Sequence, residues 1–248
     1  DKPFDRRFHQ AMVAVARALM TELRGIYAYT ESDEISLLLP REWRLFGGRV
    51  EKIVSVAAGI ASAVFTREAR VLAHFDARLW LGPTDASVVD YFRWRQADAL
   101  RCSLNGWCYW TLRHAGASAG AATAKLSGSS FEEKRDLLAE HGIELDSLEG
   151  WERQGVGLHE ETYRKLGFNP QLGRSVEAVR RRLRVEQELA VGSDYSLWIA
   201  RSRGGASRLQ LASRPAAHLQ DLGPVRSRSR GSQRPQHPGR RWGESRRP

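Results

Sequence analysis

Three polar residues, Ser32, Asp33 and Glu34, stand between two short apolar runs over residues 26–39. The two runs predict the strands of a β-hairpin with the polar residues at its tip. Carboxylates are preferred ligands of Mg²⁺, and paired divalent cations drive nucleotidyl transfer. Asp33 and Glu34 are therefore candidate catalytic residues and metal ligands, and Ser32 could hydrogen-bond a phosphate oxygen. Spacing alone favours the simpler interpretation, a polar turn.

Arg49 and Lys52 lie three residues apart on the polar side of a predicted helix over residues 49–69. They form either a solvated face or, if the hairpin carboxylates lie nearby, a clamp for a triphosphate. Lys134, near the start of a later helix, is by position alone a solvated lysine.

A polar stripe follows one face of a long helix predicted from Asp85 to about residue 114: Arg95, Asp98, Cys102 and Asn105. The remaining faces are rich in aromatic and apolar residues. Such a stripe is either a network between helices or one wall of an active site, and the sequence favours the network.

His74, Asp76 and Arg78 alternate along residues 71–81, which predict a strand with these three residues on one side. Asp76 and Arg78 form a structural pair or line a cleft, and the sequence does not separate the two. The seven histidines show no zinc spacing, and there is no glycine-rich phosphate loop.

The remaining periodicity predicts an amphipathic helix over residues 4–23, a helix over 130–141 capped by Ser129 or Ser130, and short strands or extended arms over 158–165 and 180–189. We expect Asp85 or Ser87 to cap the long helix. The early order of helix, two strands, helix, strand and helix matches the βαββαβ pattern without its first strand. The predicted fold is α+β, a ferredoxin-like or polymerase palm that lacks this strand. Because the strand is an interior one, its loss leaves unpaired backbone groups in the sheet.

The chain divides into a palm-like section over residues 1–115, a looser section of helices and short strands over 116–200, and an Arg-rich tail over 201–248 whose composition is typical of disorder. The net charge of +10 belongs to this tail, which holds 12 of the 39 basic and 2 of the 29 acidic residues. The tail could bind RNA phosphates without specificity, or it could be an appendage without function. Two cysteines, Cys102 and Cys108, are too few for a disulfide framework and point to different sides of their helix. With no apolar run of about 18 residues, we expect no membrane span and a cytoplasmic setting.

Several stretches together resemble the tRNA(His) guanylyltransferase family, in particular its bacterial-type relatives: Pro3-Phe4-Asp5, Ser32-Asp33-Glu34, Phe75-Asp76-Ala77-Arg78, the segment from Tyr91 to Asp98, and Cys108-Tyr109-Trp110. Further matches lie around Lys134, His141-Gly142-Ile143 and Gly155-Val156-Gly157. The resemblance implies addition of nucleotides, GMP from GTP, to the 5′ end of tRNA in the 3′-to-5′ direction. The 5′ end is first activated, by adenylylation from ATP or through an existing triphosphate, and the 3′-hydroxyl of the incoming nucleotide then attacks it.

The resemblance also assigns residues. It implies a palm fold with two Mg²⁺ ions, often in a tetramer, with tRNA and nucleoside triphosphates as partners. Asp33 becomes a metal-bridging carboxylate and Glu34 its neighbour. The predicted nucleotide-binding residues are Ser32, Asp33, Arg49, Lys52, Lys134 and Asn105.

Three features depart from the family pattern. The Asp-Gly segment of the family's first strand, which supplies the other metal-binding carboxylate, has no counterpart in the chain. The family's His-x-Asn falls on Leu100 and Cys102, which cannot form the same hydrogen bonds. A family Asn falls on Glu144. We therefore expect residues 1–248 to be inactive alone, because two cations about 3.5–4 Å apart would meet too little negative charge. A non-catalytic RNA-binding relative is the alternative, and another palm-type enzyme such as a nucleotide cyclase is a weaker one.

Overall fold

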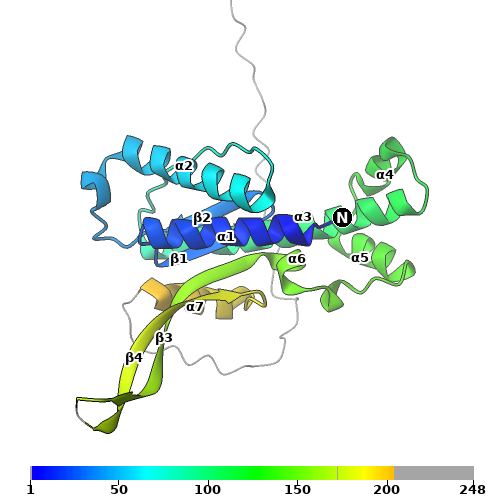
Figure 1. The fold of residues 1–248 in the computed structure, drawn as a ribbon. Helices are drawn as coiled ribbons and strands as arrows, with labels where there is room; N and C mark the ends of the chain where they lie inside the picture. Colours follow the sequence, from blue (N-terminus) through cyan, green and yellow to red (C-terminus); the bar gives the residue numbers. More distant parts are fainter. Residues whose placement is uncertain (1, 172, 204–248) are drawn as a thin grey trace, which may run out of the picture.

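The computed structural model describes residues 2–171 and 173–203. Its elements, shown in Figure 1, are α1 (Arg6–Glu22), β1 (Tyr27–Glu31), β2 (Glu34–Leu38), η1 (Leu45–Gly48), α2 (Val50–Ala69), α3 (Asp85–His114), α4 (Ala119–Leu126), α5 (Phe131–Glu140), η2 (Leu145–Ser147), α6 (Gly150–Gln154), β3 (Val156–Asn169), β4 (Arg174–Glu186) and α7 (Gly192–Arg203). The predicted helices over 4–23, 49–69, 85–114 and 130–141 and the hairpin over 26–39 are confirmed.

One antiparallel sheet has the strand order β2-β1-β3-β4. The register places Tyr27 opposite Leu38 on β2 and opposite His159 on β3. The short hairpin therefore joins a strand that comes more than a hundred residues later in the chain. Within the described residues, β2 has no neighbour on its outer edge.

The two faces of the sheet bury different residues, because successive side chains of a strand point to opposite sides. Ala28, Val156 and Leu158 pack against α1, while Tyr27 and Tyr29 pack in a cluster with residues of α3 and α7. The second helix, α2, packs beside α1. The sheet is thus enclosed by two pairs of helices.

The long helix α3 connects the sheet to a helical lobe formed by α4 and α5 (Figure 1). Its N-terminus is capped by Thr84, whose side chain accepts from the Ser87 backbone N–H while the Ser87 side chain accepts from Thr84. The predicted caps, Asp85 or Ser87, therefore lie inside the helix, and Ser87 serves as the second half of a capping box. Helix α5 is capped by Ser130, one of the two residues predicted.

The strand predicted over residues 71–81 does not form. The segment keeps the alternation of a strand, with Ala73 and Phe75 half-buried and His74, Asp76 and Arg78 exposed, but it joins no ladder. Its backbone N–H groups at Ala73 and Phe75 donate instead to the hydroxyls of Thr66 and Ser62 on α2. A strand needs a hydrogen-bonded neighbour, and this segment has none among the described residues.

The two extended arms form one long hairpin, β3–β4, much longer than the strands predicted over 158–165 and 180–189. Its first residues belong to the sheet, and its distal part projects away from the body (Figure 1). We call the part from Glu160 to Leu183 the arm. Helix α7 follows it and extends through Arg203, so it overlaps the first three residues of the predicted tail; residues 204–248 lie outside the described part of the chain.

Both cysteines are free, as predicted, and Cys102 is exposed whereas Cys108 is buried. No helix in the described part of the chain is long and apolar enough to cross a membrane.

Candidate active site

A cleft of about 740 Å³ opens between the tip of the β1–β2 hairpin, the N-terminal end of α1, the middle of α3 and the start of α6. The predicted tip residues Ser32, Asp33 and Glu34 all line it. The hairpin can reverse tightly because Ser32 adopts a positive φ of 49°, a conformation accessible to short polar residues in turns. The strands behind the tip are held in the sheet, so the tip is presented from a fixed base.

The polar end of the cleft contains a buried arginine among carboxylates. Arg95 of α3 forms an ion pair with Glu34 and lies 3.8 Å, from Nη2 to Oε2, from Glu31. Arg95 is 8% exposed, although a guanidinium is always charged. Its guanidinium carbon lies over the ring of Trp94, 5.2 Å from the ring centroid. The hairpin tip and α3 are therefore joined by charge pairing across some sixty residues of sequence.

Burial raises the pKa of Glu31; the carboxylates of Asp98 and Asp33 add to the rise, and Arg95 opposes it. Asp98 also lines the cleft and accepts two hydrogen bonds from Arg101, at 2.6 and 3.0 Å. The polar end therefore combines four carboxylates with the buried guanidinium of Arg95, whereas Arg101, which pairs with Asp98, is exposed and does not line the cleft. The buried guanidinium is a donor that can form charge-assisted hydrogen bonds with an anionic ligand such as a phosphate.

The opposite end of the cleft is aromatic. Phe4 and Trp151 meet edge to face with centroids 6.1 Å apart, and His9 stacks on Trp151 at 4.3 Å. Trp110 completes this wall. Burial, with a smaller effect of the nearby Arg6, lowers the pKa of His9 to about 4, so the imidazole is neutral at neutral pH. Flat rings at this spacing offer stacking surfaces for a nucleobase.

Several buried polar atoms around the cleft have no hydrogen-bond partner within the described residues: His9 Nε2, Glu31 Oε2, Arg95 Nε and Ser103 Oγ. Leaving a buried donor or acceptor unpaired costs about 1–3 kcal/mol. Four such atoms around one cleft indicate that its natural contents are polar and hydrogen-bonding.

The described residues do not fit a two-cation centre. No group of three or more His, Cys, Asp or Glu side chains in residues 2–171 and 173–203 is arranged to hold a metal ion. Asp33 and Glu34 supply two carboxylates at the tip, and the carboxylate of Glu34 is already paired with Arg95. The Mg²⁺ pair predicted from the resemblance therefore has too few ligands here.

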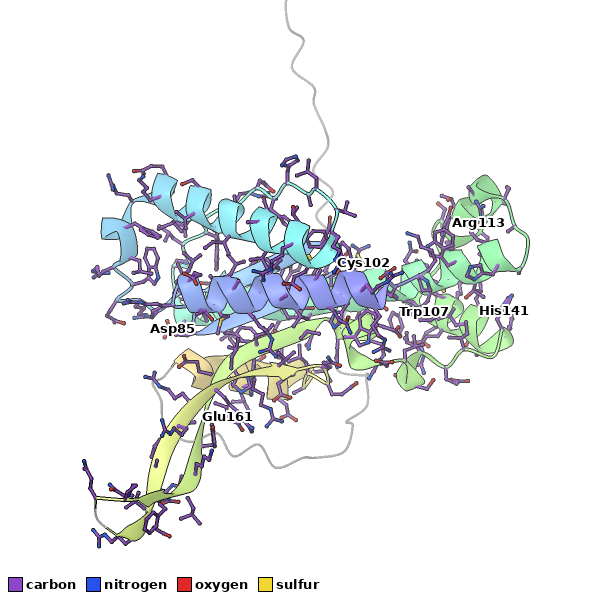
Figure 2. All side chains as sticks on the ribbon, viewed as in Figure 1. Asp85, Cys102, Trp107, Arg113, His141 and Glu161 are labelled. Atoms are coloured by element: carbon purple, nitrogen blue, oxygen red, sulfur yellow. The ribbon has the colours of Figure 1, made fainter. Side chains whose placement is uncertain are left out.

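The other predicted nucleotide-binding residues lie outside the lining of this cleft. Arg49 is the N-terminal cap residue of α2, with its Nε 3.4 Å from the Phe46 carbonyl, and Lys52 follows on the exposed side of that helix. Asn105 is exposed on α3, and Lys134 lies in the lobe, where its carbonyl accepts from the Cys108 thiol. The structure thus brings Ser32, Asp33 and Glu34 together in the cleft but not these four residues. The lobe that contains Lys134 can be found in Figure 2 by the labels of Trp107, Arg113 and His141.

The polar stripe on α3 forms one wall of the cleft, and among the described residues its ion pairs run to the β1–β2 hairpin and within α3, not between helices. Arg95, Asp98 and Cys102 line the cleft, and Arg95 and Asp98 also form ion pairs. The Asp76–Arg78 pair, in contrast, is exposed to solvent, with Nε 3.8 Å from Oδ2, and does not line the cleft.

Sequence reasoning missed His9, Ser103 and Trp151 as parts of this site. Ser103 directly follows Cys102 on α3. Only its place on the buried face of the helix could have indicated it. His9 and Trp151 stack although they are far apart in sequence. No local pattern could have paired them.

A second polar surface lies on the arm. Odd-numbered residues of β3 and their partners on β4 share one side of the hairpin, which carries Lys165, Arg174, Arg180 and Arg182 beside Tyr163. The guanidinium of Arg182 lies 5.1 Å from the Tyr163 ring centroid and pairs with Glu161, which Figure 2 labels on the arm. Basic residues around an aromatic ring are typical of a surface that binds a nucleic-acid backbone. We call this side the basic face.

Comparisons with known proteins agree with this architecture. The family described as tRNAHis guanylyltransferase matches residues 1–83, and the Thg1 C terminal domain matches residues 86–191. The tRNA(His) guanylyltransferase of Debaryomyces hansenii is 32% identical over 203 residues, which cover 75% of this chain and 77% of that protein. A probable tRNA(His) guanylyltransferase of Drosophila melanogaster is also 32% identical, with 64% of this chain and 59% of that protein covered.

Solved structures show the same palm-like fold. A bacterial tRNA(His) guanylyltransferase-like protein in complex with ATP superposes with a TM-score of 0.63 at 26% identity, covering 82% of both chains. The enzyme from Saccharomyces cerevisiae gives a TM-score of 0.60 at 26% identity, covering 63% of this chain and 75% of that one. The chain therefore belongs to the tRNA(His) guanylyltransferase family of nucleotidyltransferases.

Proposed function

We propose that this protein acts at the 5′ end of tRNA, where members of its family add a nucleotide. The observation that supports this proposal most directly is the cleft, in which the Ser32-Asp33-Glu34 tip faces a buried arginine at one end and an aromatic wall at the other. Such a cleft suits a nucleoside triphosphate, with the base against Trp151 and the phosphates toward Ser32 and Arg95. GTP as the donor and ATP as the activating nucleotide are in keeping with related proteins whose complexes contain these nucleotides.

The direction of addition, 3′ to 5′, follows from the resemblance and is part of the proposal. In the chain itself, Ser32 can donate a hydrogen bond to a phosphate oxygen, and Arg95 can pair with phosphate through its free Nε. Asp33 remains the proposed catalytic carboxylate of the hairpin tip. Four residues outside the lining of the cleft stay predicted nucleotide-binding residues: Arg49, Lys52, Asn105 and Lys134. They can contact a substrate only if it extends beyond the cleft.

tRNA is the proposed macromolecular partner, and the basic face of the arm supports it. The arm projects beyond the body, so its arginines can follow a phosphate backbone without displacing core contacts (Figure 1). We also propose a homo-oligomer, the tetramer of the family. The side of the arm opposite the basic face exposes Leu166, Phe168 and Val179, which are 76%, 66% and 66% exposed, and apolar side chains so exposed favour contact with a second copy. Light scattering of the wild type and of a Leu166→Ser/Phe168→Ser variant tests this: the variant should be the smaller species.

We further propose that residues 1–248 alone bind substrates but turn them over poorly, because the described carboxylates do not hold two cations. The experiment is incorporation of labelled GTP into a 5′-truncated tRNA with Mg²⁺, beside direct measurement of tRNA affinity. The expected result is tRNA binding with weak but measurable incorporation, and robust incorporation would contradict the proposal. Asp33→Ala should leave tRNA affinity nearly unchanged, because Asp33 lies at the tip and not on the arm.

A non-catalytic RNA-binding role is the second candidate, and the Arg95–Glu34 ion pair favours it. The same two measurements separate the candidates: incorporation that Asp33→Ala removes supports the enzyme, whereas tRNA binding with no incorporation under any divalent cation supports the binding protein. Absence of both tRNA binding and incorporation contradicts the two proposals together.

A further inference from the structure

The mismatch between the cleft and a divalent cation has a specific cause, which is the position of Arg95. Its guanidinium pairs with Glu34 from the hairpin tip and approaches Glu31 to 3.8 Å. Glu34 is one of the two tip carboxylates open enough to reach a cation, since its side chain is 55% exposed. The Glu31 side chain is 15% exposed and has an unpartnered Oε2.

Arg95 is held in this place by its surroundings. The contact with the Trp94 ring and the burial of the residue hold the guanidinium, and its ion pairs among the described residues are with these two carboxylates. Its Nε has no hydrogen-bond partner among the described residues. Because this buried N–H donor is unpaired, the protein alone does not satisfy the hydrogen-bonding capacity of Arg95.

A guanidinium and a divalent cation compete for the same carboxylate lone pairs. Mg²⁺ requires a close oxygen shell, and an oxygen that already accepts from Arg95 is a weak ligand, while the positive charge itself repels a cation. We infer that Arg95 occupies the cation-binding position on Glu34 and Glu31, so that this cleft excludes divalent metal until Arg95 is moved or removed.

If Arg95 is removed, the carboxylates of Glu31 and Glu34 lose the positive charge that they share, and Asp33 of the same tip also lines the cleft. The inferred exclusion of metal is a property of the protein without RNA or nucleotide, so it does not depend on the proposed function.

Binding of Mn²⁺, followed by the loss of its free signal in electron paramagnetic resonance, tests the inference on the full chain. Arg95→Met removes the charge and keeps most of the volume, and it should tighten Mn²⁺ binding by at least about tenfold relative to the wild type. Arg101→Met is the matched control, because Arg101 lies on the same helix and pairs with Asp98 but not with Glu34. The control should change the affinity by no more than about twofold.

A second substitution at the exposed tip keeps the test decisive if Arg95→Met fails to fold. Glu34→Gln should leave the weak Mn²⁺ binding of the wild type unchanged, because Arg95 already occupies that carboxylate, and in the Arg95→Met background it should remove the gain. Folded Arg95→Met protein without tighter binding overturns the inference. Tight binding by the wild type that Glu34→Gln weakens overturns it as well.

Discussion

The hydroxyl groups of Tyr27 and Tyr195 lie 2.8 Å apart in the core, where both side chains are fully buried. The hydrogen bond joins β1, which supports the hairpin tip, to α7 near the end of the described chain. Burial raises the pKa of both tyrosines, so both remain neutral and one hydroxyl donates to the other. Helix α7 is therefore part of the support of the cleft and not an appendage.

The two hydroxyls should be energetically coupled. The two single substitutions should together lower the unfolding free energy by more than the double substitution does. Tyr195→Phe leaves the Tyr27 hydroxyl buried without a partner, which costs about 1–3 kcal/mol of unfolding free energy. Tyr27→Phe/Tyr195→Phe removes both groups and should cost less than the sum of the single changes. Urea unfolding of the four proteins measures the coupling; strictly additive effects would show that the hydrogen bond contributes nothing.

The buried His9 should make stability depend on pH. Its pKa is about 4 in the folded protein and 6.5 when unperturbed, so the unfolded chain binds a proton over an interval in which the folded protein does not. The contribution of His9 is fully present above about pH 6.5 and is lost as pH falls toward about 4. His9→Gln should flatten this decline in denaturation measured between pH 4 and 7. His74→Gln, at an exposed position, is the control, and an equal effect of both substitutions contradicts the assignment.

Gly155 should be far less tolerant of substitution than Gly142, although both have a positive φ, 74° and 73°. A Cβ at Gly155 would lie 2.6 Å from the Tyr29 hydroxyl oxygen and 2.8 Å from the Thr30 carbonyl, whereas one at Gly142 meets nothing within 4 Å. Gly142→Ala should cost about 1 kcal/mol through backbone strain alone. Gly155→Ala should cost at least about 1 kcal/mol more, because its ψ of −168° is also reserved for glycine. Thermal or urea unfolding compares the two, and equal costs would show that the close contacts relax freely.

The two sides of the arm should differ in their effect on RNA binding. Arg180 lies on the basic face with no ion pair recorded among the described residues, while Arg164 lies on the opposite side and pairs with Glu177 at 2.9 Å. Arg180→Ala should weaken tRNA binding several-fold and reduce the slope of log affinity against log salt by about 1. Arg164→Ala should leave both unchanged. Filter binding at several salt concentrations measures this, and equal losses would argue against a face-specific contact.

Local sequence pattern predicted the helices of the first half well, because α1, α2 and α3 each carry enough apolar periodicity to specify themselves. It failed at residues 71–81, where strand alternation is present but a hydrogen-bonding neighbour is not. It also missed α7, although Tyr195, Trp198 and Ile199, the buried residues of that helix, have the i, i+3, i+4 spacing of a helix face. The Arg-rich composition that begins just after them obscured this signal.

For the site, the sequence indicated the hairpin tip and the stripe on α3 but not their contact. The pairing of Arg95 with Glu34 is created by packing across the sheet, so no spacing rule could reveal it. The same is true of the aromatic wall, where Phe4 and His9 meet Trp151. The residue types indicated which side chains could take part in chemistry. Only the fold determined which of these side chains line the same cleft.

The thirty residues of α3 contribute to two cores. Val88 and Phe92 pack with the sheet cluster, while Leu104, Cys108 and Leu112 pack with the lobe. At about 1.5 Å per residue, this single rod is about 45 Å long. The separation between the sheet cluster and the lobe is thus set by a stiff helix and not by loops. A rigid substrate that touches the protein at both the N-terminal and the C-terminal end of α3 must therefore match the length of this helix, and a shorter one can reach only one end.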